Sequence, residues 1–155
     1  MSPVIKGSLD GHQLQIGIVV SRWNAEVTDG LLAGARQALS SCGVPDERIT
    51  IAEVPGAFEI PLAAQTLAER ACDAIVALGC VIKGETAHFE YVSSIAMQGI
   101  AKVSRDYEVP VTCGILTTYD ADQAIARSRD DDDNKGAEAA LAAVETANIL
   151  RALRS

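Results

Sequence analysis

The most apolar strand candidate of the chain meets its longest helix candidate in thirteen residues, 79–91, which read GCVIKGETAHFEY. The apolar run before this turn covers 74–82, and helical periodicity begins after the turn. In an open parallel sheet, ligands bind where the strands deliver their carboxyl ends. The free N–H groups at the start of the next helix also favour an anion. The stretch therefore predicts an α/β fold with a site for phosphate or a phosphorylated substrate.

Composition and charge narrow the class of protein. A chain of 155 residues can bury a core without disulfides or metals, and 48% hydrophobic with 4% aromatic residues favours closely packed helices on a sheet. The net charge of -8 argues against nucleic acid or an anionic membrane as the main partner, because both require clustered Lys and Arg. An anionic substrate would need a local positive pocket.

The four cysteines, at positions 42, 72, 80 and 113, form no CxxC pair and no metal-ligand spacing. Two of them fall within apolar, strand-like runs, so we expect buried, reduced thiols and a cytoplasmic protein. Residues 1–13 lack an apolar signal-peptide core, and no apolar run approaches the length of a membrane span. We therefore expect no targeting segment.

Strand-like and helix-like segments alternate along the rest of the chain. The expected strands cover 14–20, 49–54, 73–82 and 109–117, and the expected helices lie near 27–39, 61–71, 88–106, 121–128 and 137–153. This alternation predicts a four-stranded parallel sheet with right-handed crossovers and helices on both faces, a three-layer α/β/α sandwich. Residues 1–13 read as an extended arm, which leaves 14–155 as one core domain.

Polar and aromatic residues follow each expected strand, so we expect them to meet at one edge of the sheet. They are Trp23 and Asn24, the Ala57-Phe58-Glu59 segment, the Lys83 to His88 turn, and Thr117 with Thr118. The combination of aromatic, carboxylate, imidazole and hydroxyl groups suits a polar ring compound.

Each candidate residue also has a purely structural interpretation. His88 can move protons near neutral pH, or only hydrogen-bond at the start of a helix. Trp23 stands in a polar turn where a flat ring can stack on a substrate, although it could also fill the core. Phe58 could be a packing residue. Glu59 lies in an apolar stretch, and a half-buried carboxylate needs partners such as ligand hydroxyls.

The remaining polar signals are weaker. Gly79 and Gly84 match neither a Walker A loop nor GxGxxG. Arg127 and Lys135 are candidate cations that alone would be solvated surface charges. The aspartates at 130–133 read as a solvated loop, because contiguous aspartates are a poor match to known metal cages.

The chain resembles the lumazine synthase family in four stretches, which are SRWN at 21–24, VPGAFEIP at 54–61, ALGCVIKGETAHFEYV at 77–92 and NKGAEAAL at 134–141. GILTT at 114–118 and QAIAR at 123–127 also follow in the right order and spacing. The resemblance implies a flavodoxin-like fold and a transferase of riboflavin biosynthesis, 6,7-dimethyl-8-ribityllumazine synthase. Its reaction condenses 5-amino-6-(D-ribitylamino)uracil with 3,4-dihydroxy-2-butanone 4-phosphate and releases phosphate and water, without a metal or organic cofactor.

The resemblance also implies a role for each residue of these motifs. His88 is expected as the acid/base and Arg127 as the catalytic phosphate-binding cation. The residues expected to bind the pyrimidine and its ribityl chain are Trp23, Asn24, Ala57, Phe58, Glu59, Cys80, Val81 and Ile82, with Lys135 in support. The expected phosphate site consists of Gly84, Glu85, Thr86 and Arg127.

In this family the active site lies between subunits of a pentamer, so Cys113 and Arg127 are expected to come from a neighbouring copy, and the arm is expected to add a strand to that copy's sheet. This chain departs from the family at two places. Position 113 is commonly aromatic in relatives and is cysteine here. The segment before NKG is commonly glycine-bearing and neutral or basic, whereas here four aspartates, 130–133, precede it. The resemblance leaves open five, ten or sixty subunits in an icosahedral assembly, and an association with a riboflavin synthase.

Two other classes of function use the same fold. A lumazine or flavin carrier would bind the ring product without turnover, and Cys113 with the aspartate run leaves room for it. A flavodoxin-like FMN electron carrier is disfavoured, because the turn at 21–24 is not a hydroxyl-rich phosphate loop.

Overall fold

The computed structural model describes residues 1–155, and at its centre lies a parallel sheet of four strands in the order β2-β1-β3-β4. The strands are β1 (Ile16–Ser21), β2 (Ile49–Val54), β3 (Ala74–Ile82) and β4 (Val111–Thr118). The helices are α1 (Ala25–Ser41), α2 (Ile60–Glu69), α3 (His88–Tyr107), α4 (Ala121–Ala126) and α5 (Lys135–Arg154). Two short 3₁₀ turns, Asp46–Arg48 and Ala57–Glu59, precede β2 and α2.

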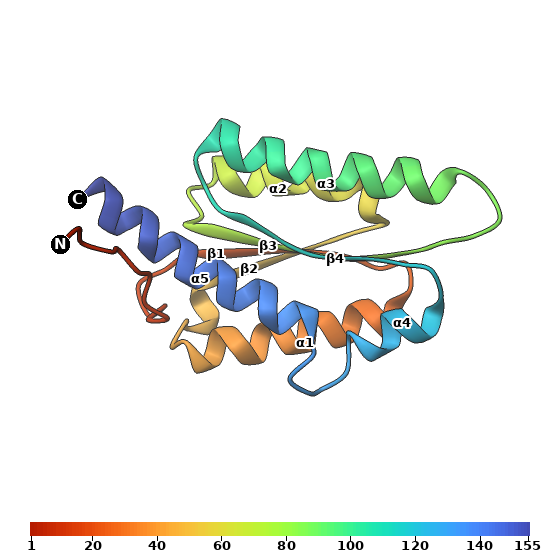
Figure 1. Cartoon of the computed structure of the whole chain (residues 1–155), viewed down its shortest axis with the longest axis horizontal. Helices are drawn as coiled ribbons and strands as arrows, with labels where there is room; N and C mark the ends of the chain where they lie inside the picture. The colour runs from red at the N-terminus through yellow and green to blue at the C-terminus, as the bar shows by residue number, and fades with distance from the viewer.

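Helices cover both faces of the sheet, which confirms the three-layer α/β/α prediction. Figure 1 shows α2 and α3 on one side of the strands and α1, α4 and α5 on the other. Alternate residues of β1 therefore face different layers: Ile18 and Val20 join the core beneath α1 and α5, whereas Val19 joins the core beneath α2 and α3. Burial on both faces explains why β1 and β3 are apolar almost without interruption.

The ends of several elements differ from the expected ones by one to three residues, for local reasons. α2 ends at Glu69 because Ala71 adopts the left-handed conformation, with φ 61°. β4 begins only after Pro110, which has no N–H to give to the sheet. α5 starts at Lys135 because the side chain of Asn134 caps it.

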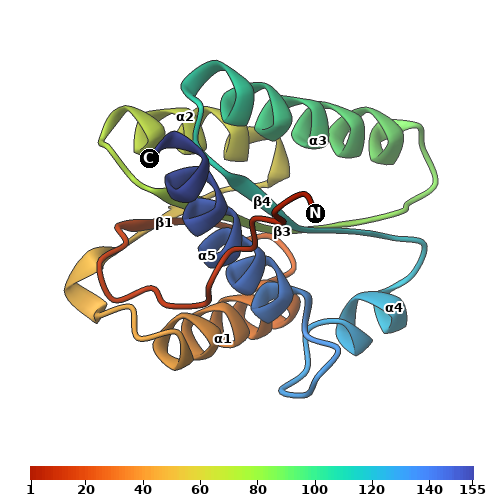
Figure 2. The same cartoon turned by 60° about the vertical axis from the view of Figure 1, so that its left-hand side comes forward.

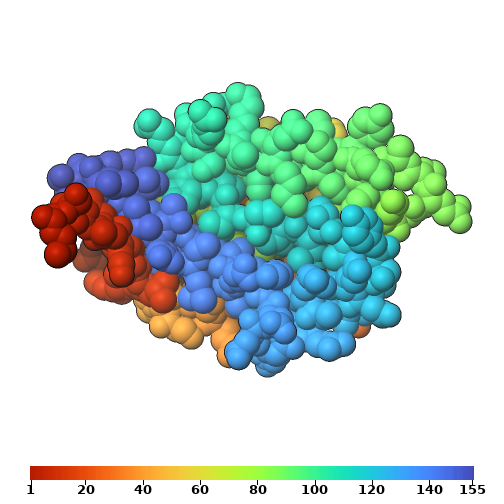
Figure 3. Space-filling view, in the orientation of Figure 1, coloured from red at the N-terminus to blue at the C-terminus, as the bar shows by residue number.

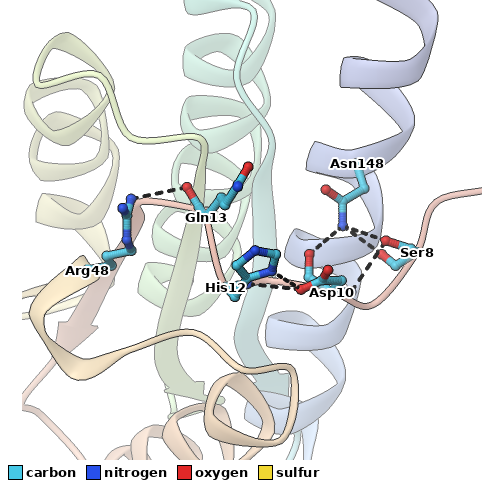
Figure 4. Close-up of polar contacts among 6 residues, drawn as sticks. All are labelled: Ser8, Asp10, His12, Gln13, Arg48 and Asn148. Atoms are coloured by element: carbon cyan, nitrogen blue, oxygen red, sulfur yellow. Dashed lines mark hydrogen bonds and ion pairs between the residues drawn. The ribbon is translucent and has the colours of Figure 1, made fainter.

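The arm forms no strand within its own chain. Instead it lies along α5 (Figure 2), where Nδ2 of Asn148 donates to the carbonyl oxygens of Ser8 at 2.8 Å and Asp10 at 3.0 Å. Figure 4 shows this contact together with the bond from Nη1 of Arg48 to the carbonyl oxygen of Gln13. The strand expected on a neighbouring copy stays a prediction.

The space-filling view places the arm and the β3–α3 turn at opposite ends of the molecule (Figure 3). The turn, residues 83–88, is exposed throughout and projects from the body of the protein. None of the helices combines the length and hydropathy that a membrane span requires.

Candidate functional site

One cleft of about 360 Å³ collects most of the predicted site residues. It lies beyond the carboxyl ends of β1, β2 and β3 and beside the start of α3, where a parallel sheet presents ligand sites. The cleft is lined by Trp23, Asn24, Ala57, Phe58, Glu59, Cys80, Val81, Ile82, His88 and Val92.

The turn after β1 is fixed from two sides. The N–H groups of Arg22 and Trp23 continue the ladder to β2, donating to the carbonyl oxygens of Val54 at 2.9 Å and Pro55 at 3.1 Å. Asn24 adopts the left-handed conformation, with φ 63°, and its Nδ2 donates to the carbonyl oxygen of Cys80 at 3.1 Å. The backbone of Trp23 is therefore held between β2 and β3, while the residue as a whole is 60% exposed and lines the cleft.

Glu59 carries a polar atom that the protein leaves without a partner. Its Oε2 is buried and makes no hydrogen bond. Glu59 lines the cleft beside Phe58, a residue that is 60% exposed. A buried carboxylate oxygen without a partner costs free energy, so this atom is suited to accept hydrogen bonds from a ligand's hydroxyl groups.

His88 is the first residue of α3 and is exposed at the cleft. Its backbone N–H donates to Oγ1 of Thr86 at 3.4 Å. The exposed residues Gly84, Glu85 and Thr86 precede the helix but line neither this cleft nor the second pocket described below. The imidazole is thus free to meet a ligand, and the expected phosphate residues stand open at the edge of the site.

Cys80 contributes backbone and a neutral thiol to the cleft. Burial raises the pKa of the Cys80 thiol to about 11. At neutral pH the sulfur is therefore protonated and a poor nucleophile, and covalent catalysis by this cysteine is disfavoured. Val81 and Ile82 follow it at the end of β3, and all three residues line the cleft.

Three of the predicted residues outside the cleft lie in a second pocket, of about 290 Å³, between β4 and α5. Cys113, Arg127 and Lys135 line this pocket together with Thr117 and Thr118. A single chain therefore divides the residues that follow its four strands between two pockets. β4 is the edge strand on the far side of β3, whereas the cleft is bordered by the other three strands.

Backbone contacts hold the cations of the second pocket. The N–H of Lys135 donates to the carbonyl oxygen of Arg127 at 2.9 Å, and Nη1 of Arg127 donates to the carbonyl oxygen of Gln123 at 3.0 Å. Nζ of Lys135 pairs with Glu138 at 2.8 Å. Arg127 has no carboxylate partner, so its charge remains available to an anion.

The cysteines are all free, but they are not all buried as expected. Cys42 and Cys80 are buried, Cys72 is half-buried and Cys113 is exposed. Cys113 lies on the edge strand β4, where no further strand covers it, and its Sγ lies 3.3 Å from Sδ of Met97.

Sequence reasoning missed three contributors to this region. Val92 lines the cleft because it lies one helical turn after His88, which its spacing of four could have indicated. Gly56 contacts the ring of Trp23, and Asn134 connects α5 to α1 and to the loop before it. The contacts of Gly56 with Trp23 and of Asn134 with Gly30 have no signal in local sequence, because each joins segments distant along the chain.

Comparison with known proteins assigns the family. Residues 13–151 match the family model described as 6,7-dimethyl-8-ribityllumazine synthase. A relative from Caulobacter vibrioides, 6,7-dimethyl-8-ribityllumazine synthase 1, is 53% identical over 141 residues, which cover 90% of this chain and 92% of that protein. The chain therefore belongs to the 6,7-dimethyl-8-ribityllumazine synthase family, the transferases of riboflavin biosynthesis that the motifs of the sequence indicate.

Proposed function

We propose that the cleft of this chain binds 5-amino-6-(D-ribitylamino)uracil and that a neighbouring copy completes it for condensation with 3,4-dihydroxy-2-butanone 4-phosphate. The observation that carries this proposal is the separation of the two groups of site residues. His88 lines the cleft, whereas Arg127 lines a different pocket beyond β4. A second copy that places its β4–α5 side against the first copy's cleft would bring the two groups together.

In this proposal the cleft recognises the pyrimidine by stacking and by backbone hydrogen bonds. The indole of Trp23 stacks on the ring, and the peptide groups of Cys80, Val81 and Ile82 bind its edge. Asn24 fixes the turn that carries Trp23. Glu59 accepts hydrogen bonds from the ribityl hydroxyls, with Ala57 and Phe58 beside the chain. The unpartnered Oε2 of Glu59 supports this assignment.

The phosphate is assigned to the projecting turn at the start of α3. Gly84, Glu85 and Thr86 precede a helix of 20 residues, whose first N–H groups and dipole favour an anion. The guanidinium of a neighbour's Arg127, with Lys135 in support, supplies the positive charge that the turn lacks. The exposure of the turn in a single chain is consistent with a neighbour that covers it.

The chemistry requires proton transfers at each step. The amine of the pyrimidine attacks the ketone, water leaves as the imine forms, phosphate is eliminated, and the second amine closes the ring with loss of water. His88 lies where it can accept and return these protons. Holding two substrates in register supplies most of the acceleration, whereas proton transfer contributes a factor of about 10²–10⁴.

The assembly and the compartment are parts of the same proposal. We assign a homopentamer as the smallest complete unit, with the arm at 1–13 pairing with a neighbour and 14–155 forming the core, and with decamers or a 60-subunit icosahedral shell as higher forms. The four free cysteines support a reducing compartment, the cytoplasm. A riboflavin synthase, which consumes lumazine, is the expected protein partner.

The test is turnover of the purified protein, followed by lumazine absorbance and by phosphate release. Arg127→Ala is expected to lose most turnover because the phosphate loses its counter-charge, and His88→Ala is expected to slow turnover without abolishing it. Arg36→Ala removes an exposed arginine of α1 that lines neither pocket and serves as the control. Wild-type protein that binds lumazine but shows no turnover above background would identify a carrier and overturn the proposal.

A further inference from the structure

Gly56 lies against the indole ring of Trp23. A Cβ atom built on Gly56 would stand 2.4 Å from Cε3 and 2.5 Å from Cζ3 of that ring. A real Cβ atom essentially never lies within 3.0 Å of another heavy atom in this way, so any residue other than glycine must displace the ring or the turn. The indole therefore occupies space that a side chain at position 56 would take.

The backbone of Gly56 does not itself require glycine. Its φ of −145° and ψ of −179° describe extended chain, which any residue adopts. The nearest atoms that an added methyl group meets all belong to Trp23. The position of the indole is therefore sufficient to explain a glycine at this position.

The indole, and not the backbone, is the part that can yield. The N–H of Trp23 is bonded to Pro55 and the next residue, Asn24, is bonded to Cys80, so the turn is held on both sides. Trp23 as a whole is 60% exposed, so its ring has solvent to move into. A methyl group at position 56 would therefore rotate the indole away from its present plane.

We infer that Gly56 is a positioning residue, whose missing side chain sets the plane in which Trp23 meets the pyrimidine ring. The inference rests on the stacking role proposed for Trp23. It assigns the specificity of the cleft for a flat heterocycle partly to a residue that makes no polar contact with the substrate.

Trp23 is the only tryptophan of the chain, so intrinsic fluorescence reports on its position directly. For Gly56→Ala we expect a shifted emission maximum and a changed acrylamide quenching constant, with an unchanged melting temperature. The KM for the pyrimidine substrate should rise about tenfold, as partial loss of a stacking contact predicts. The KM for butanone phosphate and kcat should change less than about twofold, because the ring contacts only the pyrimidine.

The matched control is the same substitution in a Trp23→Leu background. Leucine has no ring for the added methyl group to displace, so Gly56→Ala should leave the KM for the pyrimidine unchanged there. An equal rise in both backgrounds, or unchanged fluorescence in the single variant, would overturn the inference. The fluorescence measurement reports the position of the indole and does not require catalytic activity. An inactive wild-type protein would therefore contradict the proposed function, while the fluorescence of Gly56→Ala would still test the inference.

Discussion

The carboxylate of Glu59 shows how single residues prepare this site. Its Oε2 is buried beside the cleft and has no hydrogen-bond partner in the protein. A buried acceptor in this condition destabilises the ligand-free protein, whereas a hydroxyl group of a ligand would satisfy it. A ligand that donates a hydrogen bond to Oε2 would therefore remove the free-energy cost that this atom imposes on the ligand-free protein.

Glu59→Gln is expected to separate binding from stability. The amide keeps the shape of the side chain but weakens hydrogen bonds from the ribityl hydroxyls, so the KM for the pyrimidine substrate should rise about tenfold. The free energy of unfolding, measured in urea, should stay equal or increase, because an unpartnered buried charge is removed. Glu53→Gln on the exposed edge strand β2 is the control. A fall in stability with an unchanged KM would show that Glu59 serves the fold instead.

The buried thiol of Cys80 predicts how the free energy of unfolding depends on pH. Burial raises the pKa of its thiol from 9.0 to about 11. The unfolded chain loses this proton near pH 9, while the folded protein keeps it until about pH 11. The free energy of unfolding should therefore fall as pH rises through this range, and less steeply in Cys80→Ala. Equal slopes for the two proteins, measured by urea unfolding at several pH values, would show that the thiol is not shielded.

At the scale of the elements, the start of α5 is the feature that fixes the second pocket. Asn134 is only 3% exposed, and its Oδ1 caps the helix by accepting from the N–H of Ala137 at 3.0 Å. Its Nδ2 donates to the carbonyl oxygens of Gly30 at 3.1 Å and Arg129 at 2.8 Å. One side chain thus joins α5 to α1 and to the loop that follows Arg127.

Asn134→Asp should retain the cap but lose both donated bonds. The buried aspartate would face two carbonyl oxygens, so we expect a loss of about 2–3 kcal/mol in the free energy of unfolding. Loosening the loop should also raise the KM for butanone phosphate, through Arg127. The reverse exchange at an exposed cap, Asp120→Asn at the start of α4, should change stability by less than about 0.5 kcal/mol. Equal effects at the two caps would contradict this account.

At the scale of the whole molecule, the sequence predicts features that depend on neighbouring residues and misses contacts between segments that are distant along the chain. β3 was predictable because burial on both faces makes it continuously apolar, and His88 because it starts the next helix. The contact of Gly56 with Trp23 was not, because it depends on the pairing of β1 with β2. His88 and Arg127 line different pockets of one chain, and in the proposed assembly a second chain brings them together, which neither periodicity nor spacing within one chain could specify.

The shared site is the central claim, and mixed assemblies test it most directly. One variant carries His88→Ala with Glu59→Ala in the cleft, and the other carries Arg127→Ala in the second pocket. If the two groups come from different copies, coassembly at equal amounts gives interfaces in which both are intact. Turnover should then return to about a quarter of the wild-type value, as random pairing predicts. Turnover no higher than the average of the two separate variants, in assemblies shown to contain both, would place the whole site within one chain.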